Sequence, residues 1–225
     1  STHHLSHCLY GLTVVKNVSN YVYITCDGVG EGETMSIYTI DDNYKIKKLW
    51  TNFYPNSIGL LYSAITDYLG FEINEDEFKV MSLSSFGKPI YEKKLREIFD
   101  IDNFIINMDY FEFHKNTNRS FSKKLCEVFG EPFLDISVEK NFNKYADIAS
   151  SAQLILECTM KNLIKKATDL TGKRKIVLTG GVALNCKMIH SLSKQNLFEE
   201  MIVPPSPGDS GSSIGAANFA FLKEK

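Results

Sequence analysis

A pair of strand–glycine–helix units at residues 175–217 gives the strongest indication of the fold of this chain. In the first unit, an apolar strand at 175–178 runs into Gly180 and Gly181, and a helix follows. In the second, a strand ending at Val203 precedes the stretch 208–211, which opens a helix of small residues. Glycine lets the chain turn sharply and leaves the first N–H groups of the next helix free for an anionic ligand. One such turn is a weak signal, but two in succession favour an α/β fold that brings its backbone close to a nucleotide.

The N-terminal half is predicted to begin with a three-stranded antiparallel meander. Period-two alternation marks strands at 21–28, 34–40 and 45–51. The turn at 27–33 (DGVGEGE) carries three glycines and three acidic residues. Glycines allow backbone N–H groups to wrap a phosphate, and Asp27 at the strand end could hold a cation or a water molecule. The alternative is an ordinary hairpin turn with solvated acids.

Helical periodicity then predicts one helix at 56–69 and the longest helix at 144–170, which is closed by Thr171 and Gly172. The order from Tyr21 is therefore three strands, helix, inserted region, long helix, strand, helix, strand, helix. This order predicts an α/β fold, a ribonuclease H-like βββαβαβα lobe with helices on both sides of a mixed sheet. The insertion is expected at about 74–140.

Two histidines near the start, His3 and His7, are spaced i, i+4, so a helix would place both imidazoles on one face. That spacing can chelate one metal ion, whereas His4 points elsewhere. The local sequence supplies no third ligand, and a tag remnant or a solvated helix start is the open alternative. Because the sequence begins abruptly and without methionine, we expect a segment of a longer chain.

Charge and cysteine usage narrow the class of protein. The net charge of −2 gives no electrostatic case for nucleic acid or anionic membrane as a partner. No window approaches the roughly 18 apolar residues of a spanning helix. Five scattered cysteines without a CxxC pair indicate buried thiols of a cytoplasmic protein; they are Cys8, Cys26, Cys126, Cys158 and Cys186.

Five motifs occur in the order found in one known family: HHLSH at 3–7, DGVGE at 27–31, FKVMSLSSFGKP at 78–89, TGGVALNCKM at 179–188 and PPSPGDSGSSIGAA at 204–217. In these motifs the chain resembles the carbamoyltransferase family, which includes nodulation-factor and antibiotic O-carbamoyltransferases. It is similar to the tRNA threonylcarbamoyl transferases as well. The resemblance implies the actin, sugar-kinase and heat-shock ATPase superfamily, in which two related lobes close on a nucleotide.

The resemblance also implies a set of site residues. His3, His7 and Asp209 match the family's metal ligands, with iron as the expected ion and manganese, zinc or magnesium as alternatives. The candidates for binding ATP or carbamoyl-adenylate are Asp27, Gly28 and Gly30 in the second phosphate loop and Gly180, Gly181 and Asn185 along the adenosine pocket. His3 and Lys79 are the candidate catalytic residues.

The implied activity is transfer of a carbamoyl group from carbamoyl-adenylate, made from carbamoyl phosphate and ATP by a missing neighbouring domain, to a hydroxyl of a small molecule or glycoside. Residues 1–20 would be the metal-site helix and the end of a mostly missing first lobe, and residues 21–225 the second lobe. The segment alone should be a poor catalyst. A homodimer is one open alternative for its oligomeric state. Two alternatives remain: another ATP-dependent superfamily member, kinase-like or tRNA-modifying, or a nucleotide-binding interaction module without chemistry.

Overall fold

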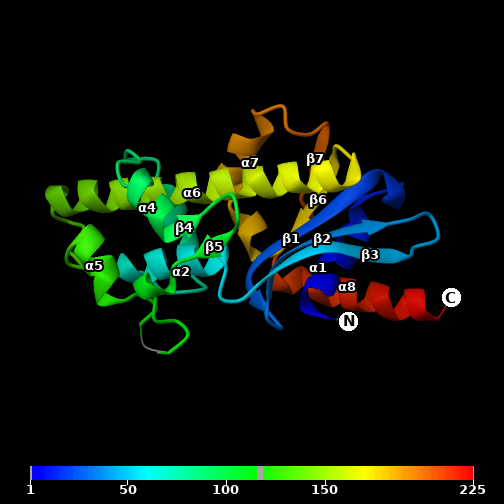
Figure 1. Ribbon diagram of the computed structural model, residues 1–225, viewed down its shortest axis with the longest axis horizontal. Coiled ribbons are helices and arrows are strands. Elements are labelled where there is room, and N and C mark those ends of the chain that lie inside the picture. Colours follow the sequence, from blue (N-terminus) through cyan, green and yellow to red (C-terminus); the bar gives the residue numbers. More distant parts are fainter. Residues whose placement is uncertain (1, 116–118, 225) are drawn as a thin grey trace. The chain divides into compact units, whose positions relative to one another are not determined.

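The computed structural model describes residues 2–115 and 119–224 (Figure 1). Ser1 of the expected metal-site segment, residues 116–118 of the expected insertion and Lys225 of the expected second lobe lie outside the described residues. The chain divides into two compact units, one comprising Ser1–Gly59 and Met160–Lys225 and the other Leu60–Thr159. The boundary expected at residue 20 stays a prediction.

A five-stranded mixed sheet with the order β3-β2-β1-β6-β7 forms the centre of the first unit. The first three strands pair antiparallel, whereas β1–β6 and β6–β7 are parallel. The strands are β1 (Tyr21–Gly30), β2 (Glu33–Ile40), β3 (Ile46–Phe53), β6 (Lys175–Thr179) and β7 (Glu200–Ile202). Together with the helices described below, this topology confirms the expected ribonuclease H-like order.

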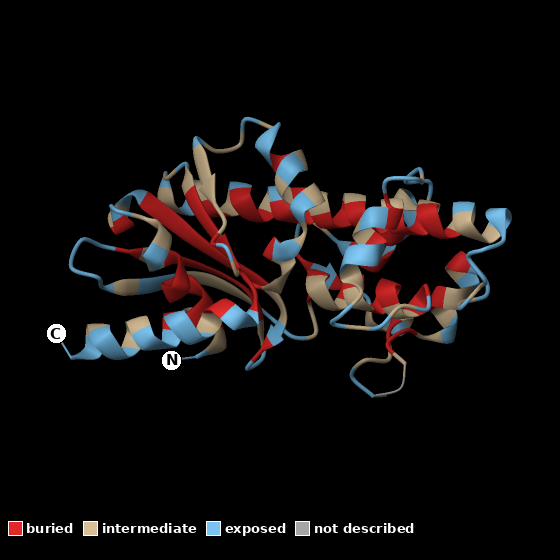
Figure 2. Ribbon diagram, turned by 180° about the vertical axis from the view of Figure 1, so that it is seen from behind, coloured by how far each residue is buried: buried red, intermediate tan, exposed pale blue. Residues whose placement is uncertain are grey.

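Helices cover both faces of this sheet, as the sequence predicts. On one face, Tyr23 and its register partner Tyr38 pack with Leu9 of α1 (His3–Tyr10) in one core cluster. Helix α8 (Asp209–Lys223) lies beside α1 on that face (Figure 1). On the other face, Lys166 of α6 (Glu139–Thr171) lies over the ring of Trp50. Because both faces are covered, β1 is buried at every position from Tyr21 to Cys26 (Figure 2).

Two expected boundaries are wrong. Strand β1 continues through Gly30, so the turn consists of Glu31 and Gly32 rather than the whole stretch 27–33. Both turn residues have positive φ, 52° and 90°, which is the conformation that reverses a hairpin in two residues. A register shift in the β1–β2 pairing between Cys26 and Gly30 accommodates the glycine-rich strand end. Helix α6 begins at Glu139 rather than at 144.

The second unit contains most of the segment between the meander and β6. Its elements are α3 (Glu77–Leu83), α4 (Glu92–Ile98), β4 (Phe99–Asp100), β5 (Ile105–Ile106) and α5 (Lys123–Phe129), together with most of α2 (Ile58–Tyr68) and the first part of α6. Aromatic side chains build its core: Tyr68 packs edge-on against Phe121 and Phe129, and all three are buried.

The cysteine and charge expectations have mixed outcomes. Cys8 and Cys26 are buried, but Cys186 is exposed because it is the first residue of the surface helix α7 (Cys186–Ser193).

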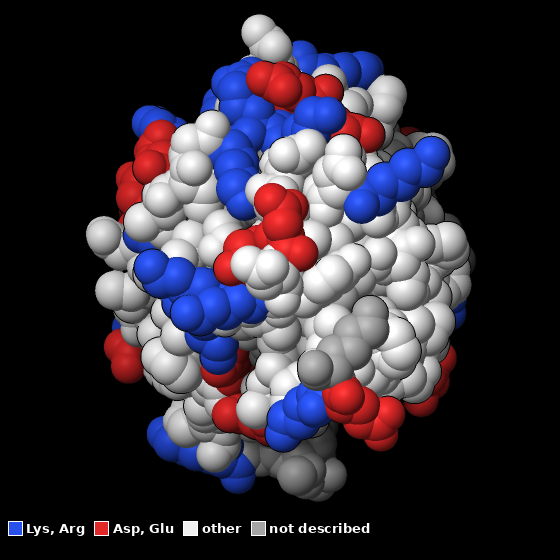
Figure 3. Space-filling model, turned by 90° about the vertical axis from the view of Figure 1, so that its right-hand side faces the viewer, with Lys and Arg blue, Asp and Glu red and all other residues white. Residues whose placement is uncertain are grey.

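Within the described residues, no helix combines the length and the apolar character that crossing a bilayer requires. On the face drawn in Figure 3, basic and acidic groups are interspersed rather than gathered into a patch of one sign.

Candidate metal centre

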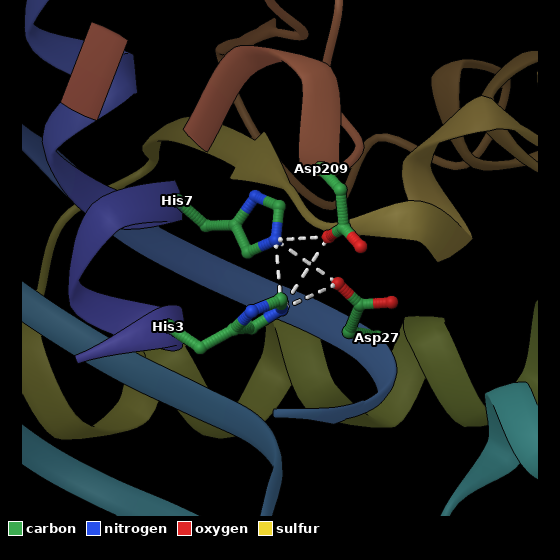
Figure 4. A group of neighbouring side chains, drawn as sticks. All are labelled: His3, His7, Asp27 and Asp209. Atoms are coloured by element: carbon green, nitrogen blue, oxygen red, sulfur yellow. Dashed lines mark hydrogen bonds and ion pairs between the residues drawn. The ribbon is translucent and has the colours of Figure 1, made fainter. Parts of the chain in front are cut away.

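Four side chains from three elements meet at one point: His3 and His7 from α1, Asp27 from β1 and Asp209 from α8 (Figure 4). One ligand atom from each residue lies within 4.8 Å of the ligand atoms of the other three. The structure therefore brings together the three residues matched as metal ligands and adds Asp27, which the resemblance assigns to a phosphate loop.

Strand periodicity explains why Asp27 faces α1. Alternate residues of β1 point to the same face, and Tyr23 and Thr25 both contact α1 or its core cluster. Asp27 is the next position in that row. On the helix, the i, i+4 spacing puts His3 and His7 on the surface that lies over the same row. The cluster thus follows from period two in the strand and period 3.6 in the helix.

Glycines in α8 bring Asp209 to the cluster. A Cβ at Gly215 would lie 1.8 Å from the carbonyl oxygen of Ser6, and one at Gly211 would lie 2.4 Å from the ring of Tyr10. Only glycine lets α8 pack this closely on α1. Asp209, the first residue of α8, then lies with its Oδ1 3.2 Å from His7 Nε2.

The distances in the cluster fit the edges of a coordination shell. His7 Nε2 lies 3.1 Å from His3 Nε2 and 3.0 Å from Asp27 Oδ2, and His3 Nε2 lies 3.2 Å and 3.5 Å from Asp27 Oδ2 and Asp209 Oδ1. Atoms bound about 2.1 Å from one ion lie about 3.0 Å apart at a right angle and about 3.4 Å apart in a tetrahedron. One imidazole N–H can be donated only once, yet His7 Nε2 approaches three acceptors. Convergence on a shared cation accounts for all of these contacts.

The donor chemistry fits a divalent ion as well. Two carboxylates and two neutral imidazoles carry a charge of −2, which a divalent cation neutralises. Nitrogen and oxygen donors together suit iron, manganese or zinc, whereas magnesium prefers oxygen ligands. The residues present therefore fit the ion that the resemblance implies.

Burial divides the cluster into an inner and an outer half. The side chain of His7 is fully buried and that of Asp27 is 16% exposed, whereas His3 is 24% and Asp209 77% exposed. An ion held here would be enclosed by His7 and Asp27 and approachable past Asp209. An open side of this kind distinguishes catalytic from structural metal sites.

The electrostatics show how strongly the inner carboxylate depends on its neighbours. Burial pushes the pKa of Asp27 upward, but hydrogen bonds with His3 and His7 outweigh it and hold that pKa well below its usual range. The hydrogen bond to Asp27 is also the main cause that raises the pKa of His3, against the effect of burial. The Nδ1 atom of His7 has no hydrogen-bond partner among the described residues, so Nε2 is its one engaged nitrogen there.

His4 lies outside the cluster, as expected. Its Nδ1 is 2.7 Å from Thr25 Oγ1 and its Nε2 is 3.0 Å from the carbonyl oxygen of Glu33. Burial lowers the pKa of His4 to about 4, so the ring is neutral at neutral pH.

The predicted nucleotide residues surround the inner carboxylate. The Gly28 N–H donates to Asp27 Oδ1 at 2.8 Å, and a Cβ at Gly181 would lie 2.8 Å from the same oxygen. Gly180 has φ +95°, and a Cβ there would lie 2.2 Å from the carbonyl oxygen of Cys26. At Gly30, an added Cβ would lie 2.1 Å from the His3 ring. These glycines let two backbone segments, the end of β1 and the turn at 180–181, approach the cluster.

Two predicted residues have local partners. The side-chain oxygen of Asn185 accepts the N–H of Met188 and so caps α7. Lys79 lies in the other compact unit, on α3, where its Nζ is 2.8 Å from Asp76 Oδ2 and its side chain is 46% exposed. The roles of both residues at a reaction site stay predictions.

The sequence did not predict the residues that pack against the backbone of Asp27 and Gly28. The hydroxyl of Ser57, which is fully buried, donates to the carbonyl oxygen of Gly28 at 2.6 Å and lies 3.3 Å from that of Asp27. A Cβ at Gly59 would lie 2.8 Å from the same Asp27 oxygen. The stretch 56–59 reads as an ordinary helix start, and no local pattern indicates that it packs on β1.

Comparison with known proteins gives consistent matches. A protein-family model described as carbamoyltransferase N-terminus matches residues 1–218. The uncharacterized protein sll1178 of Synechocystis sp. is 35% identical over 196 residues, which is 85% of this chain and 31% of that protein. Nodulation protein NolNO of Sinorhizobium fredii is 28% identical over 220 residues, 96% of this chain and 30% of that protein. The chain thus spans about a third of the length of these relatives.

A solved structure shares the fold. The activator of 2-hydroxyisocaproyl-CoA dehydratase from Clostridium difficile, with bound ADPNP, matches with a TM-score of 0.54 and 17% sequence identity. The match covers 98% of this chain and 67% of that one. At this identity the likeness shows the actin-like ATPase fold and nothing more.

Proposed function

The chain belongs to the carbamoyltransferase family, and on that premise we propose that its two histidines and two aspartates form the divalent-metal centre of an O-carbamoyltransferase. The observation that carries the proposal is the convergence of one ligand atom from each of His3, His7, Asp27 and Asp209. The chain spans about a third of the relatives' length, so the activity proposed is that of the whole protein.

In this proposal the four residues hold one ion, with iron as the expected metal and manganese or zinc as alternatives. When bound, the ion supplies Lewis-acid polarisation of carbonyl and phosphate oxygens. The buried pair, His7 and Asp27, fixes the ion from within. His3 and Asp209 complete its shell from the exposed side, from which a substrate can approach. Lys79 has its observed contacts elsewhere, so we give it no role in this centre.

We place the adenylate of carbamoyl-adenylate beside the metal, along the glycines. Gly181 leaves the space next to Asp27 Oδ1 free of side-chain atoms, and Gly180 lets the same turn lie directly against the backbone of Cys26. Helix α8 begins at Asp209 without a side-chain cap, and the N-terminus of a helix favours an anionic group. The related fold of the dehydratase activator holds ADPNP, which supports nucleotide binding by this fold.

The proposed reaction transfers the carbamoyl group to a hydroxyl. The hydroxyl oxygen bonds to the carbamoyl carbon while the bond from that carbon to the phosphate oxygen breaks. The adenylate leaves with the bonding pair, and the hydroxyl proton passes to water or to the departing phosphate. Carbamoyl phosphate and ATP as the source of carbamoyl-adenylate, and a small molecule or glycoside as acceptor, belong to the same proposal.

A calorimetric titration of the chain with Mn²⁺ tests the centre directly. We expect about one ion per chain, unchanged affinity in the control Asp102→Asn, whose carboxyl lies on the surface of the other unit, and clearly weaker binding in Asp209→Asn. Failure of Mn²⁺, Fe²⁺ and Zn²⁺ to bind the unmodified chain would overturn the proposal.

The reaction is tested on the longest natural polypeptide that contains this chain. We expect ATP to be converted to AMP only when carbamoyl phosphate is present, and carbamoyl transfer to require a hydroxyl acceptor. Conversion of ATP to ADP without carbamoyl phosphate would instead support a kinase-like member of the superfamily.

A further inference from the structure

We propose that His4 is a positioning residue: it sets the register of α1 on the sheet and thereby aims His3 and His7 at Asp27. The inference rests on the proposed metal centre and extends it to a residue that does not contact the ion. His4 is 1% exposed and lies between the two ligand histidines on the two-turn helix α1.

The imidazole of His4 joins α1 to two strands. Its Nδ1 accepts the Thr25 hydroxyl at 2.7 Å, and its Nε2 donates to the carbonyl oxygen of Glu33 at 3.0 Å. One neutral tautomer, with the proton on Nε2, satisfies both contacts. Thr25 belongs to β1 and Glu33 to β2, so the ring attaches the helix to both strands of the hairpin.

The position of Thr25 makes this attachment relevant to the metal ligands. Thr25 and Asp27 are two residues apart on one face of β1, which corresponds to roughly 7 Å along the strand. A slip of α1 by one residue would shift it by about 1.5 Å and rotate it by about 100°. Contacts of 3.0–3.5 Å between the histidines and the carboxylates would not survive that movement.

Helix α1 depends on such tertiary anchors. It has eight residues, and isolated helices shorter than roughly 12–15 residues are barely stable in water. Thr2, at its N-cap, makes no side-chain capping hydrogen bond. His4 supplies two directed bonds in the first turn, next to the ligand His3. The other end is held by apolar packing of Cys8 and Leu9 and by the side-chain amide of Asn218 in α8, which donates to the carbonyl oxygen of Leu9 at 2.9 Å. His4 attaches the first turn to the hairpin instead.

The alternative is that His4 contributes to stability as any buried, hydrogen-bonded residue does. Tyr23 provides the matched comparison. It is also buried, it lies on the same face of β1, and its hydroxyl donates to the carbonyl oxygen of Val18 at 3.1 Å. It lies one step further from Asp27 than Thr25, so its loss should lower stability without redirecting the histidines.

The experiment compares His4→Leu, His4→Asn, His4→Gln and Tyr23→Phe in the same chain. Mn²⁺ affinity is measured by calorimetry, site geometry by the absorption spectrum of bound Co²⁺, and stability by thermal unfolding without metal. We expect His4→Leu to weaken Mn²⁺ binding by about 10- to 100-fold, the range found when supporting residues of a metal site are removed. Asn can still accept from Thr25 and Gln can still donate to Glu33, so each should weaken binding less and change the Co²⁺ spectrum less. Tyr23→Phe should lower the unfolding temperature but leave affinity and spectrum unchanged.

The outcomes separate the two proposals. If folded His4→Leu binds Mn²⁺ within twofold of the unmodified chain, the positioning role is overturned while the metal centre stands. If the unmodified chain and Tyr23→Phe both bind no metal, the metal centre itself fails and the role of His4 falls with it. Should His4→Leu not fold, Thr25→Val carries the test because it removes only the hydroxyl that anchors Nδ1, and unchanged affinity in it and in His4→Gln would overturn the proposal.

Discussion

The cluster of His3, His7, Asp27 and Asp209 and the motif at 78–89, which contains Lys79, differ in what holds their side chains in place. In the cluster, His7 and Asp209 are 202 positions apart in the sequence, and their ligand atoms lie 3.2 Å apart because α1 and α8 pack together. Lys79 pairs with Asp76, three positions away on the same helical turn. Tertiary packing builds the first arrangement, and local helix geometry builds the second.

The energetic demands of the two regions differ accordingly. A carboxylate that is only 16% exposed, such as that of Asp27, is costly unless hydrogen bonds or a cation compensate it. Asp76 is exposed to a similar extent, 17%, but it pairs with the charged Lys79, whose side chain is 46% exposed, and partly exposed pairs of this kind contribute about 0–1 kcal/mol. A motif match indicates both regions equally, but they differ in how the carboxylate is compensated. The ion-pair partners of Asp27 among the described residues are His3 and His7, which neutralise it only when protonated, so the cluster gains more from a bound cation. This difference favours the cluster as the functional centre, and four experiments test whether the two regions differ in this way.

The largest effect is expected from His7→Ala. This change removes a fully buried ligand and leaves Asp27 with one histidine partner. We expect Mn²⁺ affinity to fall at least about a thousand-fold, more than the 10–100-fold typical of residues that only support a ligand. Calorimetry measures this, with the exposed His190→Ala as control. Equal affinity in both variants would show that the cluster is not the binding site.

A smaller loss is expected from Gly30→Ala. The new Cβ would lie 2.1 Å from the His3 ring, so the ring or the strand must move. We expect about a tenfold loss of Mn²⁺ affinity together with a lower unfolding temperature. Gly172→Ala is the control: nothing lies within 4 Å of its Cβ position, but its φ of +68° makes the substitution destabilising. If Gly172→Ala lowered metal affinity as much, the steric explanation would be wrong.

Sequence periodicity was sufficient for the layout of the first unit. Alternation in β1, the small residues of α8 and the glycine at the end of each strand-to-helix unit are local signals, and they led to the right order of elements along the chain and to helices on both sides of a mixed sheet. The i, i+4 histidines were visible for the same reason. The resemblance supplied Asp209, which no local pattern connects to His7.

The contribution of Asp27 to the histidine cluster was harder to predict. It depends on which face of β1 packs against α1. Because residues 27–33 were expected to form a turn, Asp27 was not recognised as part of the strand whose alternation decides this. Ser57 could not be found, because its hydroxyl acts on backbone oxygens of a distant strand. The exposure of Cys186 likewise follows from the placement of α7 at the surface, which its apolar neighbours in sequence do not reveal.

Below neutral pH, His4 should make the metal-free cluster region acid-sensitive. Burial lowers the pKa of His4 to about 4 from its ordinary 6.5. Its contribution to stability is therefore complete above about pH 6.5 and is lost as the pH falls toward 4, because the unfolded chain takes up the proton first. His3 has the opposite sign: its pKa is raised by the hydrogen bond to Asp27, so its contribution is present at low pH and lost as the pH rises through that raised pKa. Comparison with His4→Gln isolates the His4 effect.

We expect this effect to be on the order of 2 kcal/mol between pH 7 and pH 4.5, measured by urea unfolding at each pH. His4→Gln should lose less stability than the unmodified chain across that interval. The Lys79 region should contribute nothing there, since the pKa of Asp76 is lowered from a value already near 4. Parallel pH profiles for the two proteins would contradict the assignment of His4 as a buried neutral base.

The smallest effect is expected from Lys79→Ala, and it bears most directly on the comparison. The side chain is 46% exposed, its ion pair is local, and its Nζ lies 5.8 Å and 5.9 Å from the centroids of the Phe71 and Phe78 rings. Loss of an exposed pair and two weak ring contacts should lower stability by no more than about 1 kcal/mol. Mn²⁺ affinity should be unchanged, and so should ATP affinity in the same titration. The control is Lys93→Ala, which changes an exposed lysine in the same unit. If Lys79→Ala weakened ATP binding tenfold and Lys93→Ala did not, the local contacts of Lys79 would not reveal its function. The lysine would then be a nucleotide contact that forms only when ligand is bound.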